Sequence, residues 1–134
     1  MAKLEYVEGI GEAYADKLRA AGVTTTDKLL EMGSTPKGRE EIAEKAGIPE
    51  KLILEWVNAV DLFRINGVGQ EYADLLEEAG VDTVPELAQR KPENLYAKMM
   101  EVNTAKKLVR AMPTEAQVAD WVAQAKQLPR IVKY

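Results

Sequence analysis

The 134-residue sequence contains no cysteine and no histidine, and these absences exclude several kinds of chemistry. Without cysteine there is no disulfide framework and no thiolate, and without histidine there is no imidazole ligand or imidazole base. Lysine amines and carboxylates are the only ordinary acid and base groups that remain. We therefore expect no catalytic residues, no metal site and no cofactor.

Long apolar runs are missing too. The first residues, Met-Ala-Lys-Leu-Glu-Tyr, lack the basic and apolar regions of a secretion signal. No segment approaches the run of about 18 apolar residues that a membrane-spanning helix needs. These observations predict a soluble, cytoplasmic protein without membrane contact.

An excess of positive charge is also missing, because 18 Lys and Arg side chains face 22 Asp and Glu side chains, a net charge of −4. Lys and Arg drive phosphate binding by displacing counterions, so this balance argues against a general affinity for nucleic acids. The charges are unevenly placed, however. Residues 65–89 hold six acids and no base (−6), whereas residues 90–134 hold nine bases and four acids (9 − 4 = +5).

What the chain does have is an internal repeat. Residues 9–29 align with residues 67–87 at a constant offset of 58, and eleven of the 21 aligned positions are identical. The segment around Trp56 likewise matches the segment around Trp121. The sequence therefore predicts two copies of one unit, residues 1–64 and 65–134, which share a core.

The local patterns are helical. Apolar residues recur at helical spacing, and starts such as Thr35-Pro36 and stops such as Gly22 and Gly47 bound short segments. We expect a helix to begin at Asn103-Thr104. We also expect Leu52, Trp56, Ala59 and Phe63 to form one buried face of a helix that opens at Pro49. The sequence predicts an all-α bundle of about eight to ten short helices.

Each copy places an aliphatic residue between two glycines just before a helix. The first glycine of each pair supplies backbone angles that other residues adopt only at a cost, so the chain can reverse sharply. The residue between the glycines is expected to point inward. The second glycine leaves the first amides of the helix uncapped, which makes a potential anion site. These residues are Gly9, Ile10 and Gly11 in the first copy and Gly67, Val68 and Gly69 in the second.

Each turn is followed by Ala-Gly-Val, whose glycine lies eleven residues after the second glycine of the turn. These turns resemble the hairpins of the helix-hairpin-helix superfamily. The whole chain is similar to a family of small bacterial proteins that carry tandem copies of this unit and are described only as a domain of unknown function. Three segments carry this closer resemblance: residues 35–39, 52–58 and 92–95. The resemblance implies the fold directly and the function only by analogy.

In the superfamily, paired hairpins commonly hold duplex DNA through backbone amides that contact phosphates without reading sequence. The resemblance implies such contacts at Gly9–Gly11 and Gly67–Gly69, and some relatives also hold a cation on the hairpin carbonyls, a point that this sequence leaves open. DNA-binding hairpins usually carry a base just after the second glycine. Here Glu12-Ala13 and Gln70-Glu71 follow, with Asp16 and Asp74 one turn later, and these carboxylates repel phosphate.

Five basic residues outside the turns are candidate nucleic-acid contacts. Lys106, Lys107 and Arg110 are expected on one short helix, where they either bind a polyanion or neutralise the acidic hairpin of the same copy. Lys37 and Arg39 flank Gly38 in the first turn of another helix, as anion ligands or as an exposed pair.

The aromatic residues allow two interpretations as well. Tyr14 and Tyr72 occupy the same place in the two copies, where they either stack on a ligand or pack with the hydroxyl in water, the interpretation that we favour. Trp56 and Trp121 recur on apolar faces, so we expect them in the core.

Three functions compete. A nucleic-acid-binding module, most simply for duplex DNA, accounts for the hairpins and the basic end, and it is our first choice. A protein-interaction module that keeps the fold but whose turns no longer bind phosphate accounts for the acidic residues beside the turns. An enzyme, such as a small glycosylase or a carboxylate-dependent hydrolase, fits this short chain least well. The oligomeric state does not follow from the sequence.

Overall fold

The computed structural model describes residues 2–134 and contains only helices and connecting segments in this range. Eight α-helices and one 3-10 helix lie within residues 2–134, which confirms the predicted all-α bundle of about eight to ten helices. In chain order they are η1 (Leu4–Tyr6), α1 (Glu12–Ala20), α2 (Thr26–Met32), α3 (Pro36–Ala46), α4 (Glu50–Leu62), α5 (Gln70–Glu78), α6 (Val84–Ala88), α7 (Pro92–Lys106) and α8 (Glu115–Gln127).

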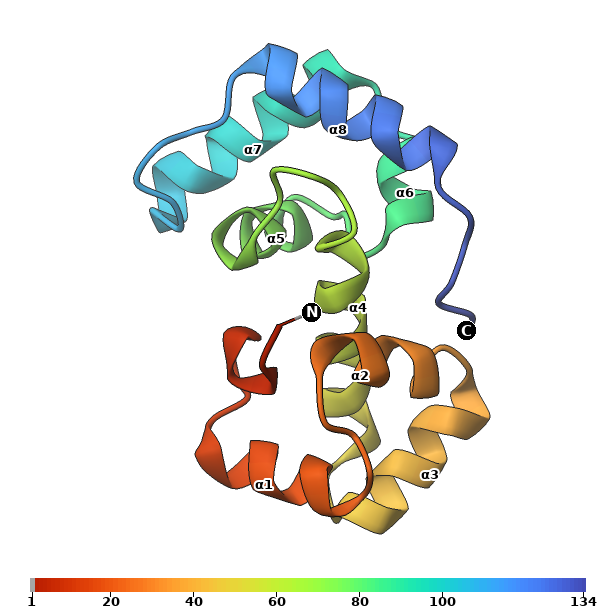
Figure 1. Cartoon of the computed structure of the whole chain (residues 1–134). Coiled ribbons are helices and arrows are strands. Elements are labelled where there is room, and N and C mark those ends of the chain that lie inside the picture. The colour runs from red at the N-terminus through yellow and green to blue at the C-terminus, as the bar shows by residue number, and fades with distance from the viewer. Residues whose placement is uncertain (1) are drawn as a thin grey trace. The chain divides into compact units, whose positions relative to one another are not determined.

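The chain divides into two compact units (Figure 1). Unit 1 comprises Met1–Asp61 together with Ile131–Tyr134, and unit 2 comprises Leu62–Arg130. The division thus falls close to the boundary of the sequence repeat. The last four residues follow unit 2 in the sequence but pack on unit 1.

Helix boundaries in unit 1 follow the local signals. Thr25 and Thr35 cap α2 and α3, since their hydroxyls accept hydrogen bonds from the amides of Lys28 and Gly38, both at 3.1 Å. Gly47 ends α3 in the left-handed conformation, at φ 68°. Within the unit, α3 packs against both α1 and α2.

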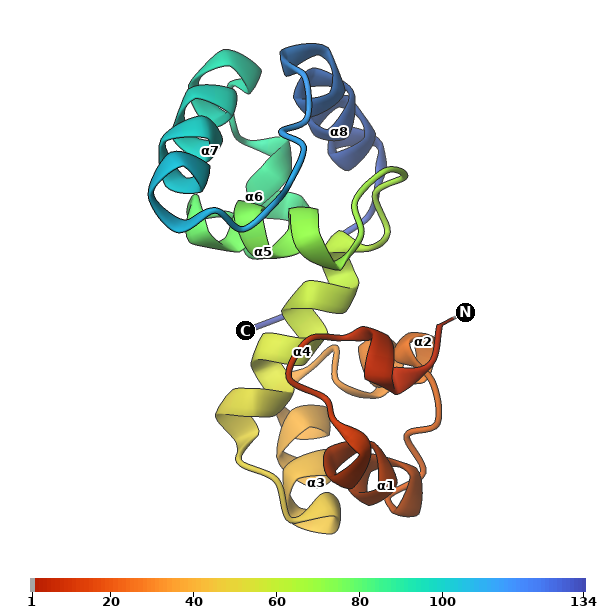
Figure 2. The same ribbon diagram turned by 90° about the vertical axis from the view of Figure 1, so that its left-hand side faces the viewer.

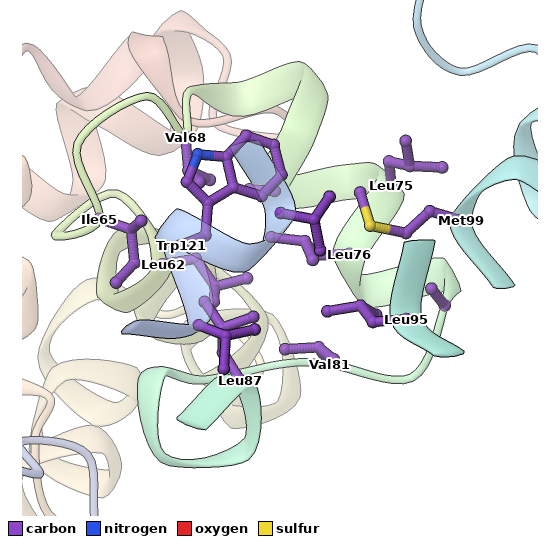
Figure 3. Close-up of a cluster of buried hydrophobic side chains, with 14 of the residues drawn as sticks. Leu62, Ile65, Val68, Leu75, Leu76, Val81, Leu87, Leu95, Met99 and Trp121 are labelled. Atoms are coloured by element: carbon purple, nitrogen blue, oxygen red, sulfur yellow. The ribbon is translucent and has the colours of Figure 1, made fainter. Parts of the chain in front are cut away.

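The core of unit 2 is built around α8, which packs against α6 and α7. Figure 3 shows Trp121 from α8 among Leu62, Val68 and Leu76. Thr114 and Gln117 form a capping box at the start of α8, in which each side chain bonds to the backbone of the other residue.

The buried face of α4 differs from the expected one. Ile53, Trp56, Val57 and Val60 are buried, with at most 4% of each side chain exposed. The expected partners Leu52 and Ala59 are only half-buried, and Phe63 lies beyond the end of the helix. The prediction missed this because the run 52–60 is apolar on two sides and its periodicity admits more than one face.

No helix within residues 2–134 combines the length and the apolar character needed to cross a membrane.

Candidate nucleic-acid interface

The two glycine-flanked turns have the same backbone geometry in the two units. Gly9 and Gly67 lie at φ 93° and 98°, the left-handed region that favours glycine. One backbone hydrogen bond between residues three apart closes each turn. The amide of Ile10 donates to Val7 O at 3.0 Å, and that of Val68 donates to Ile65 O at 3.1 Å. The predicted sharp reversal is confirmed at both places.

A tryptophan lies directly against the first glycine of each turn. A Cβ atom on Gly9 would lie 3.1 Å from Nε1 of Trp56, and one on Gly67 would lie 3.0 Å from Nε1 of Trp121. Both tryptophans are nearly fully buried, as predicted. The glycines are therefore needed for space as well as for their backbone angles.

The aliphatic residues between the glycines point into the core. Ile10 is 3% exposed and Val68 is 5% exposed, which confirms the expected inward orientation. Their side chains are thus unavailable to a ligand. Any contact at these positions has to come from the backbone.

The second glycine of each turn opens a helix without a side-chain cap. Gly11 and Gly69 occupy the N-cap positions of α1 and α5 in extended conformations. A Cβ atom on Gly11 would meet no atom within 4 Å, so its surroundings are open. The first amides of a helix carry a partial positive charge, and this arrangement can hold an anion.

Acidic side chains surround the turn of unit 1. Glu12 and Asp16 are exposed on α1. The Arg19 guanidinium is engaged by Glu5 Oε1 at 2.7 Å and by Asp16 Oδ1 at 3.4 Å. The hydrogen bonds from Arg19 lower the pKa of the Glu5 carboxyl below its ordinary value. Arg19 therefore neutralises carboxylates of its own unit.

The turn of unit 2 is held by α8. Gln124 Oε1 accepts from the Asn66 amide at 2.8 Å, and its Nε2 donates to the Asn66 carbonyl at 3.1 Å. Gln70, at the start of α5, donates to Asp74 at 2.7 Å, and Glu71 is exposed beside it. The turn is rigidly placed, but carboxylates flank it as they flank the first.

Tyr14 and Tyr72 pack against the tryptophans. The ring centroids of Tyr14 and Trp56, and those of Tyr72 and Trp121, are each 5.2 Å apart. The Tyr72 hydroxyl donates to the Ala111 carbonyl at 2.9 Å. These contacts support the packing interpretation for both tyrosines.

The expected helix carrying Lys106, Lys107 and Arg110 does not exist. Helix α7 runs without a break from Pro92 to Lys106, and Lys107 ends it at φ 52°. Asn103 begins no helix: its side chain accepts from the Val109 amide at 2.9 Å and donates to the Val109 carbonyl at 3.3 Å. The prediction is wrong because Asn caps either end of a helix, and here it secures the segment that follows α7.

The three bases consequently have different surroundings. Lys106 Nζ lies 2.5 Å from Glu78 Oε2, so it neutralises the acidic helix α5 of its own unit. Among residues 2–134, neither Lys107 nor Arg110 takes part in an ion pair, and both are exposed. The bond from Tyr72 to Ala111 holds the backbone beside Arg110 against the first turn of α5. Figure 2 shows the segment between α7 and α8 crossing α5.

Lys37 and Arg39 do not form an exposed pair. Lys37 is exposed, but Arg39 is 4% exposed, and its guanidinium donates to the carbonyls of Gly33 and Lys133, both at 2.8 Å. The expected exposed position is wrong for Arg39, because its side chain is buried and donates a hydrogen bond to the carbonyl of Lys133, 94 residues away. Arg39 is consequently not an anion ligand.

Two features were missed by the sequence reasoning. The contacts of Arg39 with the last residues depend on folding and leave no local signal. Asp61 is fully buried at the end of α4, and its position at the repeat boundary gave no hint of this. Within residues 2–134, no three acidic side chains gather closely enough to hold a metal ion.

One protein-family model matches the chain, over residues 8–128, and its description is a domain of unknown function (DUF4332). No curated protein and no solved structure matches the chain.

Proposed function

The chain belongs to the DUF4332 family, a domain of unknown function, and we propose from its own geometry that it is a non-enzymatic helix-hairpin-helix module that binds nucleic acid. The ligand is most simply duplex DNA, held without reading sequence. One observation carries the proposal: two turns 58 residues apart share one geometry, and each opens a helix whose first amides have no side-chain cap. Phosphate is the ligand that such amides suit best.

Unit 2 supplies the cations in this proposal. Lys107 and Arg110 are exposed, and the Tyr72 bond to Ala111 keeps Arg110 near the first turn of α5. A phosphate at Gly69 would meet the first amides of α5, and we expect the flexible Arg110 side chain to reach it from the segment that Tyr72 holds. A guanidinium beside backbone amides is a strong arrangement for phosphate.

The charges limit the expected affinity. Glu12 and Glu71 lie beside the turns, and Lys106 is engaged by Glu78. With about two to four phosphate contacts, the logarithm of the binding constant should fall with the logarithm of salt concentration at a slope of about −2 to −4. We expect weak binding that is measurable at low salt and lost near physiological salt.

The test is a fluorescence-anisotropy titration of a labelled duplex at several salt concentrations. The double variant Lys107→Ser with Arg110→Ser should weaken binding to every duplex equally and make the salt slope shallower by about two. The matched control, Lys45→Ser with Lys51→Ser, removes the same charge from exposed sites of unit 1. An equal loss in the control, or no binding at low salt, would refute the proposal.

A second candidate is a protein-interaction module, favoured by the carboxylates beside both turns. Glu12 and Glu71 occupy the start of equivalent helices, where they suit a basic protein segment better than a phosphate. The double variant Glu12→Lys with Glu71→Lys separates the two candidates. It should raise DNA affinity if the turns bind phosphate. If the turns bind protein, it should abolish co-purification of a specific protein that survives nuclease treatment.

A further inference from the structure

The segment Ile131–Tyr134, which we call the closing segment, packs on unit 1 and contacts Ser34, Arg39 of α3 and Asn58 of α4. We call the place that it occupies the groove. The backbone of Lys133 makes two hydrogen bonds in this groove. Its amide donates to the Ser34 carbonyl at 2.7 Å, and its carbonyl accepts from Arg39 Nη2 at 2.8 Å. Unit 1 thus hydrogen-bonds both the amide and the carbonyl of Lys133, and neither bond involves the Lys133 side chain.

Arg39 connects the groove to the core of unit 1. Its other terminal nitrogen donates to the Gly33 carbonyl at 2.8 Å, and only 4% of the residue is exposed. A buried guanidinium that loses an acceptor is costly, since its charge is then left without compensation. Arg39 therefore requires a carbonyl where that of Lys133 now lies.

The flanking side chains add selectivity. Val132 is buried, with 1% exposed. The Tyr134 ring lies 5.9 Å from the Arg39 guanidinium carbon, and its hydroxyl donates to Asn58 Oδ1 at 3.0 Å. Lys133 itself is exposed. These contacts favour a valine and a tyrosine on either side of Lys133, with the valine buried and the tyrosine, 62% exposed, held by its hydroxyl and the face of its ring.

An open cavity adjoins the closing segment. The cavity has a volume of about 320 Å³ and is lined by Ile131 together with Asp27, Leu30, Glu31 and Ser34.

We propose that unit 1 carries a peptide-binding groove specific for Val-x-Tyr, filled by its own chain and open in trans to the closing segment of a second copy. The closing segment is joined to α8 only through the non-helical residues 128–130, a short connection of the kind at which elements exchange between copies. A tethered segment has an effective concentration on the order of millimolar, so a chain at micromolar concentration closes on itself. Exchange requires that the groove of one copy be empty. This inference is independent of the nucleic-acid proposal.

The first experiment uses an acceptor chain that ends at Arg130 and a fluorescein-labelled peptide of residues 127–134. Anisotropy should show the peptide binding to the acceptor and binding at least about 100-fold more weakly to the full chain, whose groove is occupied. The Lys133→Ala peptide should bind within about twofold of the parent. The Tyr134→Phe peptide should bind about three- to tenfold more weakly, for the loss of one hydrogen bond. The Val132→Asp peptide should not bind.

Circular dichroism of the acceptor decides how a negative result is interpreted. If the acceptor is folded and does not bind the peptide, or binds the Val132→Asp peptide equally well, the proposal is wrong. If the acceptor is unfolded, recovery of its helicity on adding the parent peptide supports the proposal, and failure to recover overturns it.

The second experiment tests the second copy as the partner. The full-length Asn58→Ala variant is the donor, because its closing segment has lost the bond from the Tyr134 hydroxyl. Mixed with the acceptor, it should give a one-to-one complex in analytical ultracentrifugation. The same donor carrying Val132→Asp as well should give none. Absence of the complex, where the isolated peptide binds, would overturn the assignment of a second copy as partner.

Discussion

Gly9 and Gly11 stand two residues apart in one turn but meet different requirements. Gly9 combines a positive φ of 93° with the indole nitrogen of Trp56 where a Cβ atom would lie. Gly11 has an ordinary extended backbone and open space around it. A methyl group at Gly9 therefore meets both strain and a neighbour, whereas one at Gly11 meets neither.

We expect Gly9→Ala to lower the free energy of unfolding by about 1–3 kcal/mol, from the left-handed conformation and the displacement of Trp56. Gly11→Ala is the matched comparison and should lower it by only about 0.5–1 kcal/mol, because alanine is disfavoured at an N-cap but meets neither a left-handed backbone nor a neighbour there. Urea denaturation followed by Trp fluorescence measures both. Equal losses in the two variants would contradict this account of the turn.

The ion pair of Glu5 with Arg19 predicts a dependence on pH. Its hydrogen bonds lower the pKa of Glu5 below the ordinary value of 4.5. A carboxyl whose pKa is lower in the folded state stabilises the fold above its unfolded pKa, and that contribution disappears as the pH falls through the folded pKa.

Wild type should therefore be more stable than Glu5→Gln at pH 7, and the difference should vanish in the acid range below the folded pKa. Because both side chains are exposed, the difference should be small and should shrink with added salt. Urea denaturation from pH 2 to 7 measures it, with Glu44→Gln on α3 as the control. A difference that is constant over the whole range would refute the prediction.

At the scale of elements, Asn103 decides where α7 ends and where the basic segment lies. Its side chain makes two hydrogen bonds with the backbone of Val109, beyond the left-handed residue Lys107. The sequence alone could not distinguish this role from the start of a new helix, because Asn is favoured at both ends. By contrast, Thr35-Pro36 was predicted correctly, since proline tolerates only the first turn.

Asn103→Ala should free the segment 107–113 and lower the free energy of unfolding by about 1–2 kcal/mol, for two lost hydrogen bonds. Asn94→Ala is the control, since Asn94 is exposed earlier on the same helix. Hydrogen exchange at the Val109 amide provides a local measure and should accelerate only in Asn103→Ala. Unchanged exchange at Val109 would show that other contacts hold the segment.

At the scale of the whole molecule, the sequence predicted what is local and repeated. The turns at Gly9 and Gly67 and the positions of Trp56 and Trp121 follow from backbone angles and apolar spacing, which short segments encode. The burial of Arg39 and the packing of the last four residues on unit 1 could not be predicted. Their partners are far apart in the sequence, and no periodicity records such contacts.

The closing segment should therefore stabilise one unit and not the other. Val132 is 1% exposed on unit 1, so Val132→Asp buries a carboxylate and should displace the segment from Arg39. We expect amides in α2 and α3 to exchange with solvent at least about tenfold faster, for a local loss of about 1.4 kcal/mol or more, because their opening is no longer opposed by the segment. Amides in α5 to α8 should keep their rates.

Hydrogen exchange measured by mass spectrometry resolves the two units, and Lys133→Asp provides the control. It introduces the same aspartate one residue later, at an exposed side chain whose backbone alone is bonded. Lys133→Asp should leave the exchange of α2 and α3 near that of wild type. Faster exchange in both units of Val132→Asp would mean that they unfold together, and the segment would then act on the whole chain rather than on unit 1.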